Sequence, residues 1–161
     1  MEDGLERIAT KAYGEIEVPE NSAIQFVGPI LGFEEFQYYY LLEVRDLPGF
    51  YWLQSKQDAN VAFIVIDPRT FMKDYELVID KIDMDILEIG AGDEVLDYVI
   101  VNIPEDPAKM TMNILGPIVI NAAKRLGIQG ISNKNDYDTK RPIFHSDGEE
   151  AKAEKEAAAG Q

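Results

Sequence analysis

Short runs of β-branched and aromatic residues, separated by turn-forming residues, make up most of this sequence. Such runs favour extended strands, because these side chains pack well on a pleated surface. Glycine and proline mark the turns between them. The runs lie at residues 13–18, 23–27, 38–44, 50–54, 61–66, 75–79, 95–103, 110–115, 118–122 and 127–131. Many short strands at this spacing predict a sandwich or a small barrel rather than alternating β and α units.

One segment has a helical pattern instead. Ile82, Ile86 and Ile89 recur at helical spacing, which predicts a short amphipathic helix over residues 81–89, ended by the Gly-Ala-Gly-Asp sequence at 90–93. We therefore predict a mainly β fold over residues 1–145. Its form is either a sandwich or a small barrel, with one short helix.

The segment 146–161 differs in composition from the rest of the chain. It reads SDGEEAKAEKEAAAGQ and contains no aromatic or β-branched residue. Such a segment buries too little apolar area to offset the entropy lost on ordering. We expect an acidic, disordered tail.

The charge balance is strongly acidic. Thirty acidic residues against fifteen basic ones give a formal net charge of −15. Direct binding to nucleic acid needs clustered Lys and Arg to displace condensed counterions, and an anionic membrane surface makes a similar demand. Neither partner is expected. The acidity either steers a basic protein partner or only maintains solubility, and composition leaves both interpretations open.

Chemical motifs are scarce. The chain has no cysteine and a single histidine, His145, at the edge of the acidic segment. No phosphate-binding glycine loop or nucleophile elbow is present, so neither a metal nor another cofactor is expected. Glu43, Asp67 and Asp97 lie in or beside apolar strands, where burial would raise their pKa and permit acid–base chemistry. The alternative is that they face solvent from the polar side of each strand.

The N-terminal sequence carries acidic residues where a signal peptide would be basic, and it has no apolar core. The longest apolar stretch, at residues 114–120, is too short to cross a bilayer. A cytoplasmic location is therefore expected.

Aromatic residues are dense in two strands, YYY at 38–40 and FYW at 50–52. Consecutive strand residues point to opposite faces, so one barrel interior cannot hold all of them. They either anchor a protein interface or lie beneath a second layer.

An ordered series of motifs runs through the folded part of the chain. The series is YGEIEV, FVGPILGFEEF, FYWLQSKQDANVAFIVIDP, VIVNIPEDPAKMTMNILGPIVINAAKRLGIQ and YDTKRPIF. From about Tyr13 to Phe144 it resembles FliW, the family of bacterial flagellar assembly factors. One stretch departs from the family pattern, because the proline of the loop at 28–34 has moved to Pro29.

The resemblance implies a compact protein with no enzymatic activity. Its expected form is a mainly β, small closed or partly open antiparallel β-barrel-like domain with one short helix. Proteins of this family bind CsrA, a small basic RNA-binding regulator, and relieve its repression of flagellin mRNA. They alternatively bind flagellin, which couples flagellin synthesis to filament assembly. A β-barrel that binds a small molecule, or an enzyme using buried carboxylates, is the alternative.

Several polar or backbone-restricting residues stand at or beside apolar strands, where packing alone would favour Val or Ile. They are either structural, satisfying backbone groups where strands bend or end, or they form the rim of an interface with aromatic anchors. The resemblance favours the interface. The predicted protein-binding residues are Gln54, Ser55, Phe63, Asp67, Pro68, Tyr75, Asn113, Pro117 and Asn121.

Overall fold

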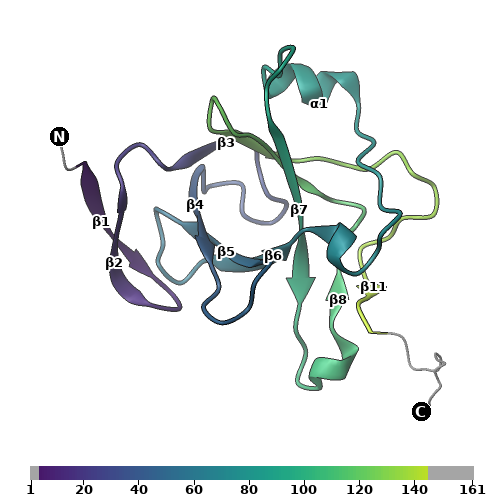
Figure 1. Ribbon diagram of the computed structural model, residues 1–161, viewed down its shortest axis with the longest axis horizontal. Helices are drawn as coiled ribbons and strands as arrows, with labels where there is room; N and C mark the ends of the chain where they lie inside the picture. The colour runs from purple at the N-terminus through teal and green to yellow at the C-terminus, as the bar shows by residue number, and fades with distance from the viewer. Residues whose placement is uncertain (1–3, 145–161) are drawn as a thin grey trace.

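The computed structural model describes residues 4–144 as a β-barrel with a hairpin packed on one side (Figure 1). One α-helix, α1 (Lys81–Ile86), and two 3₁₀-helices, η1 (Pro68–Thr70) and η2 (Pro107–Lys109), lie in the connections. The strands are β1 (Leu5–Thr10), β2 (Gly14–Pro19), β3 (Ile24–Gly28), β4 (Tyr38–Glu43), β5 (Phe50–Ser55), β6 (Ala62–Ile66), β7 (Val95–Asn102), β8 (Thr111–Met112), β9 (Ile118–Asn121), β10 (Leu126–Gln129) and β11 (Arg141–Pro142).

Seven of these strands close the barrel. Strands β3 to β7 pair antiparallel in succession, β7 pairs with β9, and β9 pairs with β10. The circle closes where β10 pairs with β3 in parallel, the one departure in the barrel from the predicted antiparallel order. Glycines permit this close pairing. A Cβ at Gly127 would lie 2.8 Å from the Phe26 ring, and one at Gly28 would lie 2.8 Å from Ile128.

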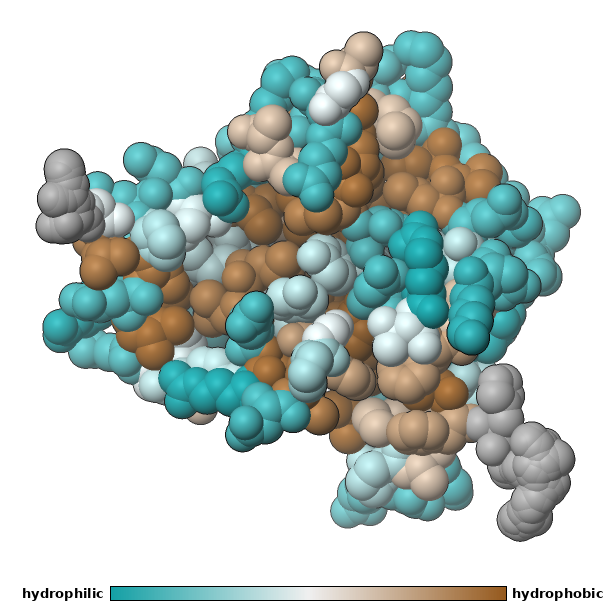
Figure 2. Space-filling model, in the orientation of Figure 1, coloured by the Kyte–Doolittle hydropathy of each residue, from teal (hydrophilic) through white to brown (hydrophobic). Residues whose placement is uncertain are grey.

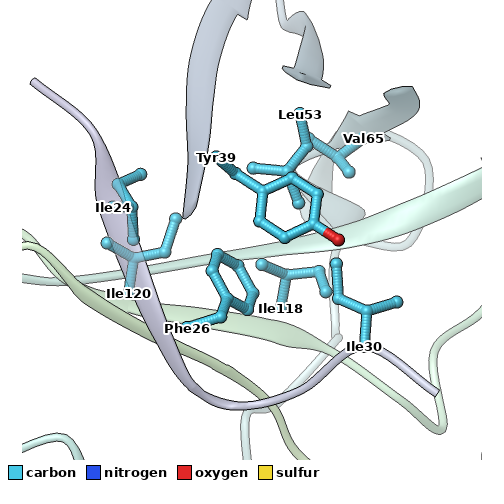
Figure 3. Close-up of a cluster of buried hydrophobic side chains, with 8 residues drawn as sticks. All are labelled: Ile24, Phe26, Ile30, Tyr39, Leu53, Val65, Ile118 and Ile120. Atoms are coloured by element: carbon cyan, nitrogen blue, oxygen red, sulfur yellow. The ribbon is translucent and has the colours of Figure 1, made fainter. Parts of the chain in front are cut away.

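The barrel interior is the main core (Figure 3). Alternate residues of each strand point inward, so residues from distant parts of the chain meet there. The Tyr39 ring packs edge-on against Phe26, with ring centroids 5.0 Å apart. The eight side chains of this cluster are Ile24, Phe26, Ile30, Tyr39, Leu53, Val65, Ile118 and Ile120.

The β1–β2 hairpin covers part of the barrel's outer face. Ile8 and Val18 pack on Tyr40, whose hydroxyl donates to Glu6 at 2.6 Å. Tyr39 and Tyr40 therefore point to opposite faces and both are buried, Tyr40 beneath this second layer. For these two tyrosines, the second-layer interpretation is confirmed.

A second outer layer covers β6, β7, β9 and β10. The segment after η1 packs Tyr75 over Ile66 and Val99, and Leu87 packs on Val119. The prediction of a strand at 75–79 was wrong. Tyr75 is buried, Glu76 exposed and Leu77 half-buried, so the chain there alternates as an extended segment does. It has no strand partner, because the barrel beneath it is closed.

The other predicted strands are confirmed within a few residues, the largest change being the contraction of 110–115 to the two residues of β8. The helix begins at Lys81 as predicted and ends three residues earlier, at Ile86. The sequence reading missed β1 and β11. The predicted tail at 146–161 and His145 lie outside the described residues. No helix in the described part of the chain is long and apolar enough to span a membrane.

Candidate protein-binding surface

Gln54 and Ser55 build the connection between β5 and β6. Both are 1% exposed. The Gln54 amide nitrogen donates to the carbonyl of Ala59, and its oxygen accepts from the Lys11 backbone N–H at 2.9 Å, which fastens the hairpin to the barrel. The Ser55 hydroxyl accepts from the backbone N–H of Asp58. These polar side chains satisfy buried backbone groups and offer almost no surface to a partner.

Asp67 and Tyr75 belong to an ionic cluster outside the barrel. Asp67 caps η1, and the Arg69 guanidinium contacts Asp67 and both oxygens of Asp97 at 3.0–3.1 Å. The hydrogen bonds that Arg69 donates to Asp97 raise the pKa of Arg69. Tyr75 is 4% exposed and stacks on Tyr137, and burial raises the pKa of its hydroxyl. Arg69 thus forms ion pairs with Asp67 and Asp97, two of the carboxylates considered for acid–base chemistry.

Asn121 is fully buried and joins two connections. Its amide nitrogen donates to the carbonyl of Leu87 at 2.9 Å, and its oxygen accepts from the Lys124 N–H. It therefore holds the end of α1 against the β9–β10 turn. Pro68, which opens η1, is also buried.

Phe63 and the 28–34 loop meet at another part of the barrel. The Phe63 ring is half-buried and lies edge-on to Phe33, with centroids 4.9 Å apart. In this loop Ile30 points into the core, whereas Leu31 is 82% exposed. The backbone reverses at Gly32, whose φ of +89° favours glycine.

Asn113 borders a groove of about 310 Å³ beside this loop. Its side-chain oxygen accepts from the Gly116 N–H at 2.8 Å, shaping the turn that leads to the buried Pro117. Two exposed aliphatic side chains stand at the groove, Leu31 and Ile131, the latter 69% exposed. The remaining lining residues are Pro29, Glu34, Leu115, Gly116, Gln129, Gly130 and Thr139.

Hydrogen bonds fix the groove's shape. The Gln129 side chain accepts from the Leu31 N–H at 2.8 Å and donates to the carbonyl of Gly116 at 3.2 Å, so it links both walls. Glu34 accepts from the Gly32 N–H, and this hydrogen bond lowers the pKa of Glu34. The exposed leucine is therefore held in place, and a carboxylate stands beside it.

More exposed aliphatic residues lie on elements that neighbour the groove. The segment 130–133 lies against residues 78–79, because the Asn133 N–H donates to the carbonyl of Val78 and a Cβ at Gly130 would lie 3.2 Å from Ile79. Helix α1, which follows residues 78–79 in the chain, lies beside β3. We call the whole set the aliphatic surface: Val27, Leu31, Val78, Ile82, Ile86 and Ile131. These are six of the eleven exposed large hydrophobic residues among 4–144.

Acidic residues border the aliphatic surface on the α1 side. Asp80, Asp83, Asp85 and Glu88 lie on or beside the helix, and Lys81 pairs with Asp85 at 3.0 Å. An apolar centre with a charged rim is the usual anatomy of a protein interface. The acidic rim favours a basic partner.

The residue pattern does not predict the centre of this surface. It predicts Ile82 and Ile86 on the apolar face of an amphipathic helix, yet they are 70% and 42% exposed. Leu31 lies in a turn, and Ile131 ends the predicted strand at 127–131, whereas β10 itself ends at Gln129. The cue that they share in the sequence is an adjacent glycine, Gly32 or Gly130.

Comparison with known proteins decides the family. The FliW protein family model matches residues 7–143. The chain belongs to the FliW family. A flagellar assembly factor from Leptospira interrogans serovar copenhageni is 39% identical over 146 residues, covering 89% of this chain and 95% of that protein. One from Natranaerobius thermophilus is 33% identical, covering 91% and 97%.

The fold agrees with that of a solved FliW. A crystal structure described as the flagellar assembly factor FliW aligns with a TM-score of 0.81 at 36% identity, covering 87% of this chain and 98% of that one. The predicted mainly β, barrel-like FliW fold is confirmed. These relatives are named as assembly factors rather than as enzymes.

Proposed function

We propose that this FliW-family protein is a non-enzymatic, cytoplasmic regulator that binds a CsrA-type RNA-binding protein. Binding relieves repression of flagellin mRNA, and flagellin binds as the alternative partner. The observation that carries the proposal is the aliphatic surface with its acidic rim, because its chemistry complements a small basic protein that also has apolar contacts to offer.

The contact centre is the groove between Leu31 and Ile131. Both side chains are largely exposed, so binding of a partner can bury most of their apolar area. Of the residues predicted from the sequence, Asn113 at the groove and the half-buried Phe63 belong to the interface. The buried ones support it by holding the connections in place.

The test compares two double variants. Leu31→Ser with Ile131→Ser removes the groove's two exposed side chains. Leu5→Ser with Leu47→Ser is the matched control, since those leucines are 55% and 51% exposed and lie outside the aliphatic surface. The first variant should weaken binding to a CsrA-type regulator at least tenfold by calorimetry, as expected when interface anchors are truncated. The control should bind like the original chain.

Flagellin provides the second measurement. Added flagellin should release the bound regulator, because the proposal makes the two partners alternatives. Equal affinities of both double variants for the regulator would contradict the placement on the aliphatic surface. Absence of binding to both the regulator and flagellin by the unaltered chain would contradict the proposed function itself.

A further inference from the structure

A second hollow lies where the hairpin meets the barrel, a region where Figure 2 shows apolar side chains at the surface. Its volume is about 360 Å³. The floor consists of barrel residues Ile24, Leu41, Leu96 and Ile120. Ile24 and Ile120 lie side by side at one end of the core cluster in Figure 3, so the hollow is an open end of the barrel interior.

Two residues that line this hollow, Arg125 and Ser22, have hydrogen-bonding capacity left over. Arg125 donates to the carbonyl of Ser22 at 3.1 Å, and no carboxylate among residues 4–144 lies within 4.0 Å of its guanidinium. The Ser22 hydroxyl oxygen is buried and has no hydrogen-bond partner. A buried hydroxyl without a partner is uncommon in folded proteins and calls for an explanation.

The cations beside the hollow differ in their carboxylate partners. Lys56 lies 3.9 Å from Glu6, and Lys124 lies 4.0 Å from both Glu88 and Asp93. Arg125 is the cation of this group that has no such partner among residues 4–144. An anionic group would therefore meet local attraction at Arg125 rather than repulsion.

The geometry points to a binding site for a medium-chain fatty acid in this hollow. The hydrocarbon chain packs on Ile24, Leu41, Leu96 and Ile120, and the carboxylate accepts from Arg125 and from the Ser22 hydroxyl. An apolar cavity with a few convergent polar groups is the general form of a ligand site, and this volume lies near the lower end of the roughly 300–1,000 Å³ range. Arginine is well suited to hold a carboxylate by two parallel hydrogen bonds.

This site is separate from the aliphatic surface. Arg125 and Leu126 stand at one end of β10, whereas Gln129 and Ile131 stand at the other end. Fatty-acid binding therefore does not depend on the proposed function. If the chain does not bind fatty acids, the proposed binding of the regulator is unaffected. If the chain does not bind the regulator, the proposed fatty-acid site is unaffected.

The test is a chain-length series of hexanoate, octanoate and decanoate, measured by calorimetry on the full chain below their micelle concentrations. Each methylene buried should tighten binding about fourfold until the hollow is full. Decanol is the comparison probe, since it has the chain without the carboxylate. Acetate should show no binding.

Three variants complete the design. Arg125→Gln should weaken decanoate at least tenfold and leave decanol unchanged, whereas Lys140→Gln, which removes one exposed cation elsewhere, should change neither. Ala122→Trp places a large side chain in the hollow and should abolish binding of both probes. Lack of saturable decanoate binding by the unaltered chain would overturn the proposal, as would decanoate binding that Arg125→Gln leaves intact.

Discussion

The turn between β5 and β6 and the loop after β3 are built in opposite ways. In the first, Gln54 and Ser55 are polar and buried, and their side chains bond to backbone groups. In the second, Leu31 is apolar and exposed, and a backbone hydrogen bond to Gln129 holds it there. Polar residues inside strands therefore indicate how this barrel is assembled. Exposed aliphatic residues such as Leu31 form the surface to which we propose that another protein binds.

The largest expected effect tests the assembly role of Gln54. Gln54→Ala leaves the Lys11 N–H and the Ala59 carbonyl without their partner. We expect a loss of about 2–3 kcal/mol in the free energy of unfolding, the cost of stranding buried polar groups. Urea denaturation measures it.

Gln57→Ala is the matched control. Gln57 also bonds to backbone groups, accepting from the N–H of Gln37 and of Tyr38, but it is exposed and water can replace it. Its loss should stay below about 1 kcal/mol. Equal losses in the two variants would remove the distinction between buried and exposed polar residues on which the comparison rests.

The two asparagines sharpen the same distinction. Asn121 is fully buried, so Asn121→Ala should cost about 2 kcal/mol, whereas Asn113 is partly exposed and Asn113→Ala should cost about 0.5–1 kcal/mol. Only Asn113→Ala should also weaken regulator binding, because Asn113 borders the groove. Melting and binding measured on both variants check this. A stable Asn121→Ala that fails to bind would place Asn121 in the interface instead.

The sequence predicts the parts of the fold that depend on neighbouring residues, and it fails where the fold depends on contacts between residues far apart in the chain. Strands β2 to β7 follow from local runs of β-branched and aromatic residues, because such side chains pack well on a pleated surface. The error at 75–79 has the same origin. Tyr75, Leu77 and Ile79 do alternate and do pack inward. Alternation indicates that the chain is extended over the barrel, but it does not indicate whether a neighbouring strand has a free edge with which to pair. The closure of the barrel decides that, and it depends on the distant β3–β10 pairing.

The site shows a similar division. Gln54 and Asn121 stand out in the sequence because they are polar among apolar neighbours, and the structure explains them by hydrogen bonds. Ile82 and Ile86 give the same helical pattern whether they face a core or solvent. The packing of Leu87 on Val119 sets the helix orientation, and this contact joins residues thirty-two positions apart. A single sequence does not contain that information in local form.

The pH dependence tests a buried polar group that has no partner. The Tyr39 hydroxyl lies in the barrel interior without a hydrogen bond, and burial raises the pKa of Tyr39 to about 12. The unfolded value is about 10. Between pH 10 and 12 the unfolded chain loses this proton while the folded chain keeps it, so the free energy of unfolding falls as pH rises. The fall is up to about 1.4 kcal/mol per pH unit for one such tyrosine.

Tyr39→Phe should therefore lessen the decline of stability above pH 10 by this one tyrosine's share and change stability little at pH 7. Tyr38→Phe, at the exposed neighbouring position, is the control and should leave the slope unchanged. Urea denaturation at pH 9, 10, 11 and 12 measures the slopes. An identical decline in Tyr39→Phe and in the unaltered chain would mean that Tyr39 gains water access before it ionises.

The smallest effect concerns the rate of association with a basic regulator. If the acidic residues steer the partner, the association rate should fall about tenfold as salt rises from 10 to 300 mM, because added ions shorten the range of the attraction. Dissociation should change less, since the apolar contacts at Leu31 and Ile131 are not screened. An association rate indifferent to salt would mean that the net charge of −15 serves solubility alone.

Two variants of equal charge then separate local steering from net charge. Asp85→Asn with Glu88→Gln removes two acids beside the aliphatic surface, where their side chains are 63% and 64% exposed. Glu15→Gln with Glu17→Gln removes two exposed acids on the hairpin. The first should slow association about threefold more than the second, because attraction falls off within about 8 Å at physiological salt. Equal slowing would show that the partner responds to the charge of the whole molecule, and the acidic rim would then give no direction to the encounter.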